Sequence, residues 1–292
     1  MTVSYKIIVD AAGDFFPGTL ETYSIPVVPM EVTVGDTSFT YTPDIDPDQI
    51  LEYYTSLKEG SKPTTSQVTA YQYNEFFTPF LEQGEDILYL SLDSAISGMC
   101  DQAILTSRDL KNKYPERQIE VVDTLSATAG IGLLLERAIK NKEEGLSLLD
   151  NANDLRKHSK SIVHLFVVED LYHLKRGGRI SALTAMVTTA LNIKPILYVS
   201  ENGELLPLTK ARGMRQSMKE IANLFDKSRL PEFNDQVIIS HSLAQKSVDM
   251  ITPMIQNITG NDKIPSVITS PVIGAHVGTG MLALCFYGRR NP

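Results

Sequence analysis

Hydrophobic and polar positions alternate between two kinds of segment along the first half of the chain. Short apolar runs, rich in β-branched residues and typical of buried strands, lie at 6–9, 86–92 and 119–122. Longer segments with apolar residues at helical spacing lie at 46–60, 70–83, 97–113 and 127–142. Asp46 and Pro47 suit the N-cap and first position of a helix that Gly60 ends. This order favours a mostly parallel sheet with helices on both faces.

The second half has a different pattern. Apolar strand-like runs lie at 162–168, 195–199, 205–209 and 237–240, with helical segments at 214–225 and 248–258. Asn202 and Gly203 stand between two of these runs, which predicts a hairpin. The uncharged run Val267–Gly288 contains proline and glycine, so we expect strand–turn–strand there rather than a membrane helix. We predict an α/β protein of two α/β domains, residues 1–155 with a mostly parallel sheet and residues 156–292 with a mixed sheet.

Composition and charge narrow the class of protein. The chain has 292 residues, 42% of them hydrophobic, and its net charge is −8, from 27 basic and 35 acidic residues. It lacks a basic block, so we expect no binding to nucleic acid. Cys100 and Cys285 are far apart in the sequence and flanked by apolar residues. We therefore expect both to be buried, reduced thiols and not ligands of a metal site. The N-terminus lacks a signal-peptide pattern, so we expect a cytoplasmic protein without stable membrane insertion.

Hydroxyl-rich segments follow the predicted strands or precede helices, at 62–67, 94–98 and 123–130. In open α/β sheets, ligands bind beyond the carboxyl ends of the strands, where free N–H groups of helix N-termini favour anions. The same serines and threonines could instead be ordinary helix N-caps. The residues alone therefore predict no more than a small anionic ligand. Common motifs of nucleotide-binding proteins, zinc hydrolases and α/β-hydrolases are missing from the sequence.

Seven blocks in this order and spacing resemble the DegV family nearly from end to end: 10–14, 62–67, 94–98, 122–126, 171–181, 194–197 and 274–280. The most specific are Pro-Thr-Thr-Ser-Gln at 63–67, Gly-Gly-Arg-Ile-Ser at 177–181 and His-Val-Gly-Thr-Gly at 276–280. The resemblance implies two α/β domains with a long-chain fatty acid held between them. It also implies a binding protein that is not an enzyme and needs no cofactor.

The resemblance further implies roles for particular residues. The fatty-acid carboxyl group would be hydrogen-bonded by Thr64 or Thr65, by Ser94 or Ser97, and by His276 from the second domain. Arg179 would lie near the mouth, where a fatty acid kinase docks and phosphorylates the carboxyl group to an acyl phosphate. Arg212 could extend this docking patch.

The tail would occupy a buried tunnel. Burial stabilises it by about 0.8 kcal/mol per CH₂, so the tail would dominate affinity while the hydroxyls set its orientation. Apolar residues in the segments 180–191 and 162–168 are the candidates for the tunnel wall. The chain departs from the family pattern at Ala11, where Ser is usual, and at Met99, where a small hydroxyl residue is usual. We expect these changes to affect a ligand contact and the shape of the pocket.

Two other functions compete with a fatty-acid carrier. A Ser/His-dependent hydrolase or a phosphotransfer enzyme could use the same cleft, although a single His276 without an orienting carboxylate is weak support. A module for another amphiphile, such as an acyl-CoA or a retinoid-like lipid, is the second alternative. A headgroup site without basic residues would argue against coenzyme A. We expect His164, His173 and His241 to be structural or exposed.

Overall fold

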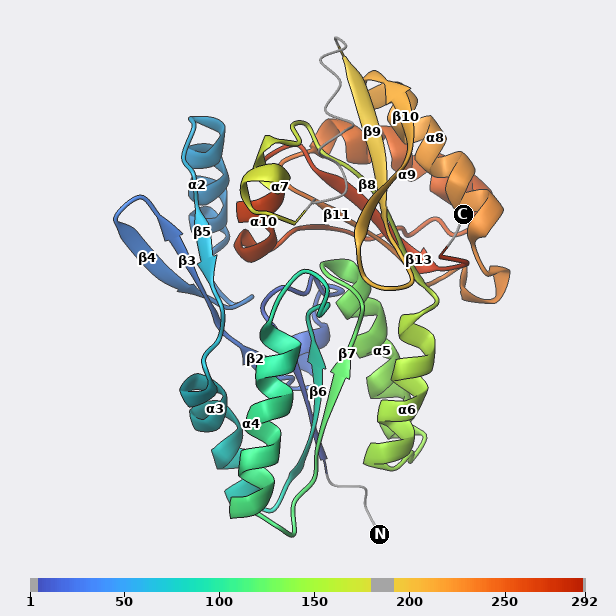
Figure 1. Ribbon diagram of the computed structural model, residues 1–292. Helices are drawn as coiled ribbons and strands as arrows, with labels where there is room; N and C mark the ends of the chain where they lie inside the picture. Colours follow the sequence, from blue (N-terminus) through green and yellow to red (C-terminus); the bar gives the residue numbers. More distant parts are fainter. Residues whose placement is uncertain (1–4, 180–191, 291–292) are drawn as a thin grey trace.

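The computed structural model describes residues 5–179 and 192–290, which form two α/β domains, one above the other in Figure 1. The first domain has a four-stranded sheet in the order β2-β1-β6-β7, and every neighbouring pair is parallel. Its strands are β1 (Tyr5–Asp10), β2 (Val27–Val28), β6 (Asp86–Ser91) and β7 (Ile119–Asp123). The sheet is covered on both faces, which explains the nearly continuous apolar runs of β1 and β6. The predicted parallel sheet is confirmed.

Helices cover both faces of this sheet (Figure 1). One side carries α3 (Ala70–Glu82) and α4 (Met99–Lys113), and the other carries α5 (Ala129–Glu143) and α6 (Leu148–Ser159). A short α1 (Thr19–Thr22) follows β1. The predicted domain boundary, between residues 155 and 156, falls inside α6, which contacts β6 and β7. The chain enters the second sheet only after this helix.

A small antiparallel sheet stands beside the first domain and was not predicted. Its order is β4-β3-β5, from β3 (Met30–Val34), β4 (Thr37–Tyr41) and β5 (Thr64–Ser66), with α2 (Pro47–Lys58) in the connection between β4 and β5. Asp46 caps α2 as predicted, because its side chain accepts a hydrogen bond from the Asp48 N–H. We expected a loop at 62–67, because a strand of three residues, all hydroxylated, has no apolar alternation that a sequence pattern could reveal.

The second domain has a six-stranded mixed sheet in the order β10-β9-β8-β13-β11-β12, where only β11 and β12 pair in parallel. Its strands are β8 (Ile162–Val167), β9 (Ile193–Val199), β10 (Leu205–Arg212), β11 (Val237–His241), β12 (Ser266–Ile268) and β13 (Leu282–Tyr287). The predicted hairpin joins β9 to β10, and Gly203 takes a positive φ in its turn. The predicted mixed sheet is confirmed.

The strand–turn–strand prediction for Val267–Gly288 is wrong in one respect. A helix, α10 (Pro271–Val277), lies between β12 and β13. It forms because the Ser270 side chain caps it and Pro271 occupies a position that needs no N–H donor. In the described part of the chain, no helix is long and apolar enough to span a membrane.

The six-stranded sheet separates two hydrophobic cores. Helices α8 (Gly213–Ser228) and α9 (Gln245–Thr259) cover one face, whereas α5 of the first domain contacts β8, β11 and β13. Strand β8 alternates between the cores, with Val163, Leu165 and Val167 toward α8 and α9, and Ile162 and Phe166 toward the first domain. The carboxyl ends of β6 and β7 therefore lie close to the second sheet, and this junction contains the candidate site (Figure 1).

Candidate functional site

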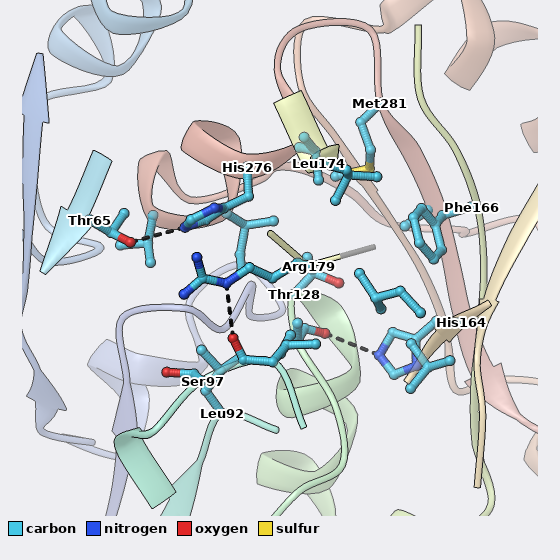
Figure 2. A pocket seen from close by; sticks show the side chains of 18 of the residues that line it. Thr65, Leu92, Ser97, Thr128, His164, Phe166, Leu174, Arg179, His276 and Met281 are labelled. Atoms are coloured by element: carbon cyan, nitrogen blue, oxygen red, sulfur yellow. Dashed lines mark hydrogen bonds between the residues drawn. The ribbon is translucent and has the colours of Figure 1, made fainter. Parts of the chain in front are cut away.

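A mostly apolar cavity lies between the two domains. It contains about 770 Å³ of space, counting the part open to solvent. Its apolar lining comes from both domains and includes Leu92, Ile96, Phe166, Leu205, Val272 and Met281. The polar lining residues include Thr65 and His276 on one side and His164 on the other (Figure 2), together with Ser97, Thr128 and Arg179.

Thr65 and His276 form the first polar place. The Thr65 Oγ1 atom lies 3.0 Å from His276 Nε2, a hydrogen bond between β5 and α10. Side chains alternate along a strand, so Thr64, on the opposite face of β5, is exposed and does not line the cavity. Of the two predicted threonines, the structure therefore brings only Thr65 to His276.

The His276 ring is neutral at physiological pH. Burial lowers its pKa to about 4, and the positive charges of Arg179 and Arg176 act in the same direction. A neutral imidazole has one donor and one acceptor nitrogen, so it can bind a carboxylate or a carboxylic acid. Gly177 packs against the ring, where a Cβ atom would lie only 2.6 Å from His276 Nδ1. Glycine is therefore required beside this histidine.

The two predicted serines have different surroundings. Ser97 lines the cavity, and its Oγ accepts a 3.3 Å hydrogen bond from the Met99 N–H. Ser94 is exposed, and its hydroxyl donates to Asp123 Oδ2 at 2.5 Å. The structure thus brings Ser97, Thr65 and His276 to one cavity and leaves Ser94 and Thr64 outside its wall. Their contact with a ligand stays a prediction.

Two arginines lie at this end of the cavity, where we expected a site without basic residues. Arg176 is the last residue of α7 (Tyr172–Arg176). Its Nη2 donates to Pro63 O at 2.9 Å and to Ala275 O at 3.2 Å. It therefore joins the two segments that carry Thr65 and His276. Arg176 belongs to the block 171–181 of the sequence, and we predicted no role for it. Only the fold shows which carbonyls it reaches.

Arg179 lines the cavity and its side chain is exposed. Its Nε donates to Ile96 O at 3.1 Å, so it bridges the second domain and the loop that carries Ser97 (Figure 2). Arg212 ends β10, and no hydrogen bond joins it to Arg179 among the described residues. An exposed cation thus stands beside the polar end of the cavity.

The structure also locates the other residues that the sequence suggested for the pocket. Phe166 and His164 from the segment 162–168 line the cavity, whereas the segment 180–191 lies outside the described residues. Ala11 and Met99 are buried in the first domain, and neither lines the cavity, so they do not shape its wall directly. Both cysteines are free and buried.

The described contacts do not assemble a catalytic triad. His276 Nε2 is bonded to Thr65, and no hydrogen bond joins His276 to Ser97 or to a carboxylate within residues 5–179 and 192–290. The same residues contain no group of three or more His, Cys, Asp or Glu that could hold a metal ion. The polar groups at this end of the cavity can hold a polar group of a ligand by hydrogen bonds.

Fold and cavity together define a two-domain α/β protein with an apolar pocket at the domain junction. A family model described as "Uncharacterised protein, DegV family" matches residues 4–289, and the chain belongs to the DegV family. A DegV domain-containing protein of Clostridium perfringens, CPE0026, is 34% identical over 286 residues, covering 97% of both chains.

Solved structures share the whole fold. The structure described as "Fatty Acid Binding of a DegV family Protein from Thermus thermophilus" is 25% identical with a TM-score of 0.81, covering 98% of this chain and 99% of that one. The Streptococcus pneumoniae Fatty Acid Kinase (Fak) B3 protein, loaded with linoleic acid, is 23% identical with a TM-score of 0.82, covering 97% and 99%. At that identity, the second likeness concerns the fold alone.

Proposed function

We propose that the protein binds a long-chain fatty acid in the cavity between its domains. The observation that carries this proposal is the cavity itself, apolar along most of its wall, with Thr65, Ser97 and His276 gathered at one end. Each buried CH₂ contributes about 0.8 kcal/mol, so a long chain suits the apolar part. Fatty acid binding by the Thermus thermophilus neighbour agrees with the same ligand here.

The carboxyl group lies, in this proposal, at the Thr65–His276 end. The hydroxyl of Ser97 donates to its oxygens, and the hydroxyl of Thr65 does so while its own oxygen accepts the hydrogen bond from His276 Nε2–H. The guanidinium groups of Arg176 and Arg179 favour the ionised carboxylate by their charge. The neutral hydrogen-bonding groups set the orientation, and the tail supplies most of the affinity.

The protein, we further propose, presents this carboxyl group to a fatty acid kinase, which converts it to an acyl phosphate. The exposed Arg179 lies beside the proposed carboxyl site, where a docking partner could reach both. The Streptococcus pneumoniae protein with the same fold carries the name of such a kinase system. The protein itself acts as a carrier in this scheme and performs no chemistry.

Ligand binding is tested by native mass spectrometry of the freshly purified protein, followed by extraction and identification of the lipid. A stoichiometric fatty acid is expected. Another bound amphiphile, or an apoprotein that refuses added fatty acids, would overturn the proposal.

Paired threonine variants test the carboxyl site. Thr65→Val keeps the side-chain shape and removes the hydroxyl, and we expect it to weaken fatty-acid binding about threefold to tenfold. Thr64→Val is the matched control, because this exposed neighbour lies on the other face of β5. Equal affinities of the two variants would contradict the assigned carboxyl site.

Presentation to a kinase is tested by reconstitution with a fatty acid kinase and trapping of the acyl phosphate with hydroxylamine. Arg179→Ala should lower the rate of acyl-phosphate formation at least tenfold, because the docking cation is removed. The control is Arg108→Ala, an exposed arginine on α4. A full rate with Arg179→Ala, or Ser97-dependent ester hydrolysis by the protein alone, would count against the carrier role.

A further inference from the structure

Helix α10 supplies the cavity with one polar side chain, His276, and with three apolar side chains, Val272, Ile273 and Val277. The helix belongs to the second domain, whereas Thr65, the partner of His276, belongs to the first. The helix contacts both α2 and β5 of the first domain (Figure 1). The distance between the two polar side chains therefore depends on how α10 lies against the first domain.

Two buried tyrosines of α2 hold the start of α10. The Tyr53 hydroxyl donates to Pro271 O at 2.9 Å. The Tyr54 hydroxyl lies 2.8 Å from Thr269 O and 3.2 Å from Ser270 O, and it can donate to either carbonyl. Burial raises the pKa of both tyrosines above its usual value, so each hydroxyl keeps its proton and remains a donor.

Two further contacts fix the same end of the helix. Asp14 Oδ1 accepts a 2.9 Å hydrogen bond from the N–H of Ser270, the residue that caps α10. Gly274 lies against the Tyr54 ring, since a Cβ atom there would be only 2.4 Å from the tyrosine hydroxyl oxygen and 2.8 Å from two ring carbons. Glycine destabilises a helix relative to alanine, and the close approach to Tyr54 explains its presence here.

The helix transmits the position of its start to His276. It has only seven residues, and His276 lies about 7.5 Å along the axis from the first of them, at about 1.5 Å per residue. A shift of the start therefore changes the 3.0 Å distance between His276 Nε2 and Thr65 Oγ1. Because α2 and β5 are consecutive elements, one segment of the first domain, residues 47–66, holds both ends of α10.

We propose that Tyr54, assisted by Tyr53, is a positioning residue of the binding site, which fixes α10 so that His276 meets Thr65 at the carboxyl end of the cavity. Loss of the Tyr54 hydroxyl keeps the ring but lets α10 shift, and the polar end then loses its geometry. The inference rests on the proposed function for the identity of the ligand. The placement of His276 is a property of the protein without ligand and can be measured there.

Histidine NMR titration of the delipidated protein is the first experiment. Burial holds the pKa of His276 at about 4, and a shifted helix lets water reach the ring. Tyr54→Phe should therefore raise this pKa by about one unit toward its ordinary value. Tyr53→Phe, which frees one carbonyl, should raise it by less. If Tyr54→Phe does not fold, Tyr53→Phe provides the test by the same comparison.

The matched control is Tyr287→Phe. Tyr287 is also buried, and its hydroxyl donates across the domain junction to Leu133 O at 3.3 Å, but it does not line the cavity. Its loss should destabilise the fold and leave the pKa of His276 at the wild-type value. An unchanged His276 pKa in both α2 variants, or an equal rise in Tyr287→Phe, would overturn the inference.

A double-mutant cycle on stearic-acid affinity tests whether Tyr54 acts through the Thr65–His276 pair. Tyr54→Phe alone should weaken binding about threefold to tenfold. In a Thr65→Val background it should weaken binding less than about twofold, because the contact that it positions is already lost. Equal losses in the two backgrounds would show a purely structural role and contradict the inference.

The outcomes separate this inference from the proposed function. A protein that binds no fatty acid, but whose His276 pKa rises in Tyr54→Phe and not in Tyr287→Phe, overturns the proposed ligand and supports the positioning role. Binding of stearic acid together with an unchanged His276 pKa in both α2 variants overturns the positioning role and leaves the fatty-acid carrier intact.

Discussion

The two ends of the cavity differ in how they are built. The Thr65–His276 end is assembled from short segments of both domains: β5, the loop before α4, α7 and α10. Direct hydrogen bonds hold these segments together, including those of Arg176 and Arg179. The opposite end rests largely on β8, β9 and β13 of one sheet, and its side chains are apolar apart from His164 and Thr128.

This difference separates affinity from orientation. Apolar burial has no preferred direction and grows with the length of the buried chain, at about 0.8 kcal/mol per CH₂. A hydrogen bond contributes only about 0.5–1.5 kcal/mol but requires a defined geometry. The sheet end should therefore control how tightly a ligand binds, and the loop end should control which way it lies.

The largest expected effect comes from filling the sheet end. Ala283 on β13 lines the cavity, and Ala283→Leu should occupy space needed by the tail and weaken binding of an 18-carbon acid by about one to two orders of magnitude. Shorter acids should lose less. Isothermal titration with acids of different length measures both effects.

The matched control for Ala283→Leu is Ala222→Leu, which overpacks the core beneath α8, remote from the cavity. It should lower the free energy of unfolding by a similar amount, about 1–3 kcal/mol, without changing fatty-acid affinity. If both variants weakened binding equally, the effect of Ala283→Leu would be one of stability alone.

Loosening the loop end should have the next largest effect. Arg176→Gln removes the group that bridges Pro63 O and Ala275 O, and fatty-acid affinity should fall about tenfold as Thr65 and His276 lose their relative position. The pKa of His276 should rise, because one of the two charges that lower it is gone. Calorimetry and histidine NMR titration check the two outcomes.

Arg156→Gln serves as the control for Arg176→Gln. Arg156 also donates to a backbone carbonyl, that of Val121, but outside the cavity. If the pKa of His276 in Arg176→Gln stayed at its wild-type value, and Arg176→Gln and Arg156→Gln lost the same fatty-acid affinity, Arg176 would have only a structural role.

A smaller effect is expected within the loop end itself. Ser97→Ala removes a hydroxyl from the cavity wall and should weaken binding about threefold, whereas Ser94→Ala, whose hydroxyl is directed to Asp123, should leave it unchanged. Direct binding titrations of both variants provide the comparison. A larger loss with Ser94→Ala would reverse the assignment.

A last prediction concerns acid stability rather than binding. The folded-state pKa of His276, about 4, lies below the unfolded value near 6.5, so its contribution is present above that value and is lost as pH falls toward 4. Relative to His276→Gln, the wild type should lose about 1–2 kcal/mol of unfolding free energy between pH 7 and 5. Burial raises the pKa of Asp10 and Asp14 to about 6, which acts in the opposite direction, but this contribution cancels in the difference. Urea unfolding of both proteins at pH 7 and pH 5 measures this difference. If the free energies of unfolding of the wild type and His276→Gln differed by the same amount at both pH values, a neutral His276 would be contradicted.

Much of the fold could be predicted because its signals are local. The helical spacing of 46–60, the apolar runs of β1 and β6, and Asn202-Gly203 all reflect interactions within a few residues. The β3-β4-β5 sheet escaped prediction because its short strands are stabilised by pairing rather than by an apolar pattern. Helix α10 was missed because the glycines within a mostly uncharged run suggested a turn, whereas the Ser270 cap favours a helix.

The sequence by itself determined the set of candidate groups: hydroxyls near strand ends, a histidine near the C-terminus and arginines in a glycine-rich block. The tertiary structure decided which of them meet. Pairing of β5 with β3 directs Thr65 rather than Thr64 to the cavity, since a shift of one residue in a strand exchanges its two faces. Domain packing likewise brings Arg176 to two distant carbonyls. Such contacts join positions far apart in the chain, and no local pattern encodes them.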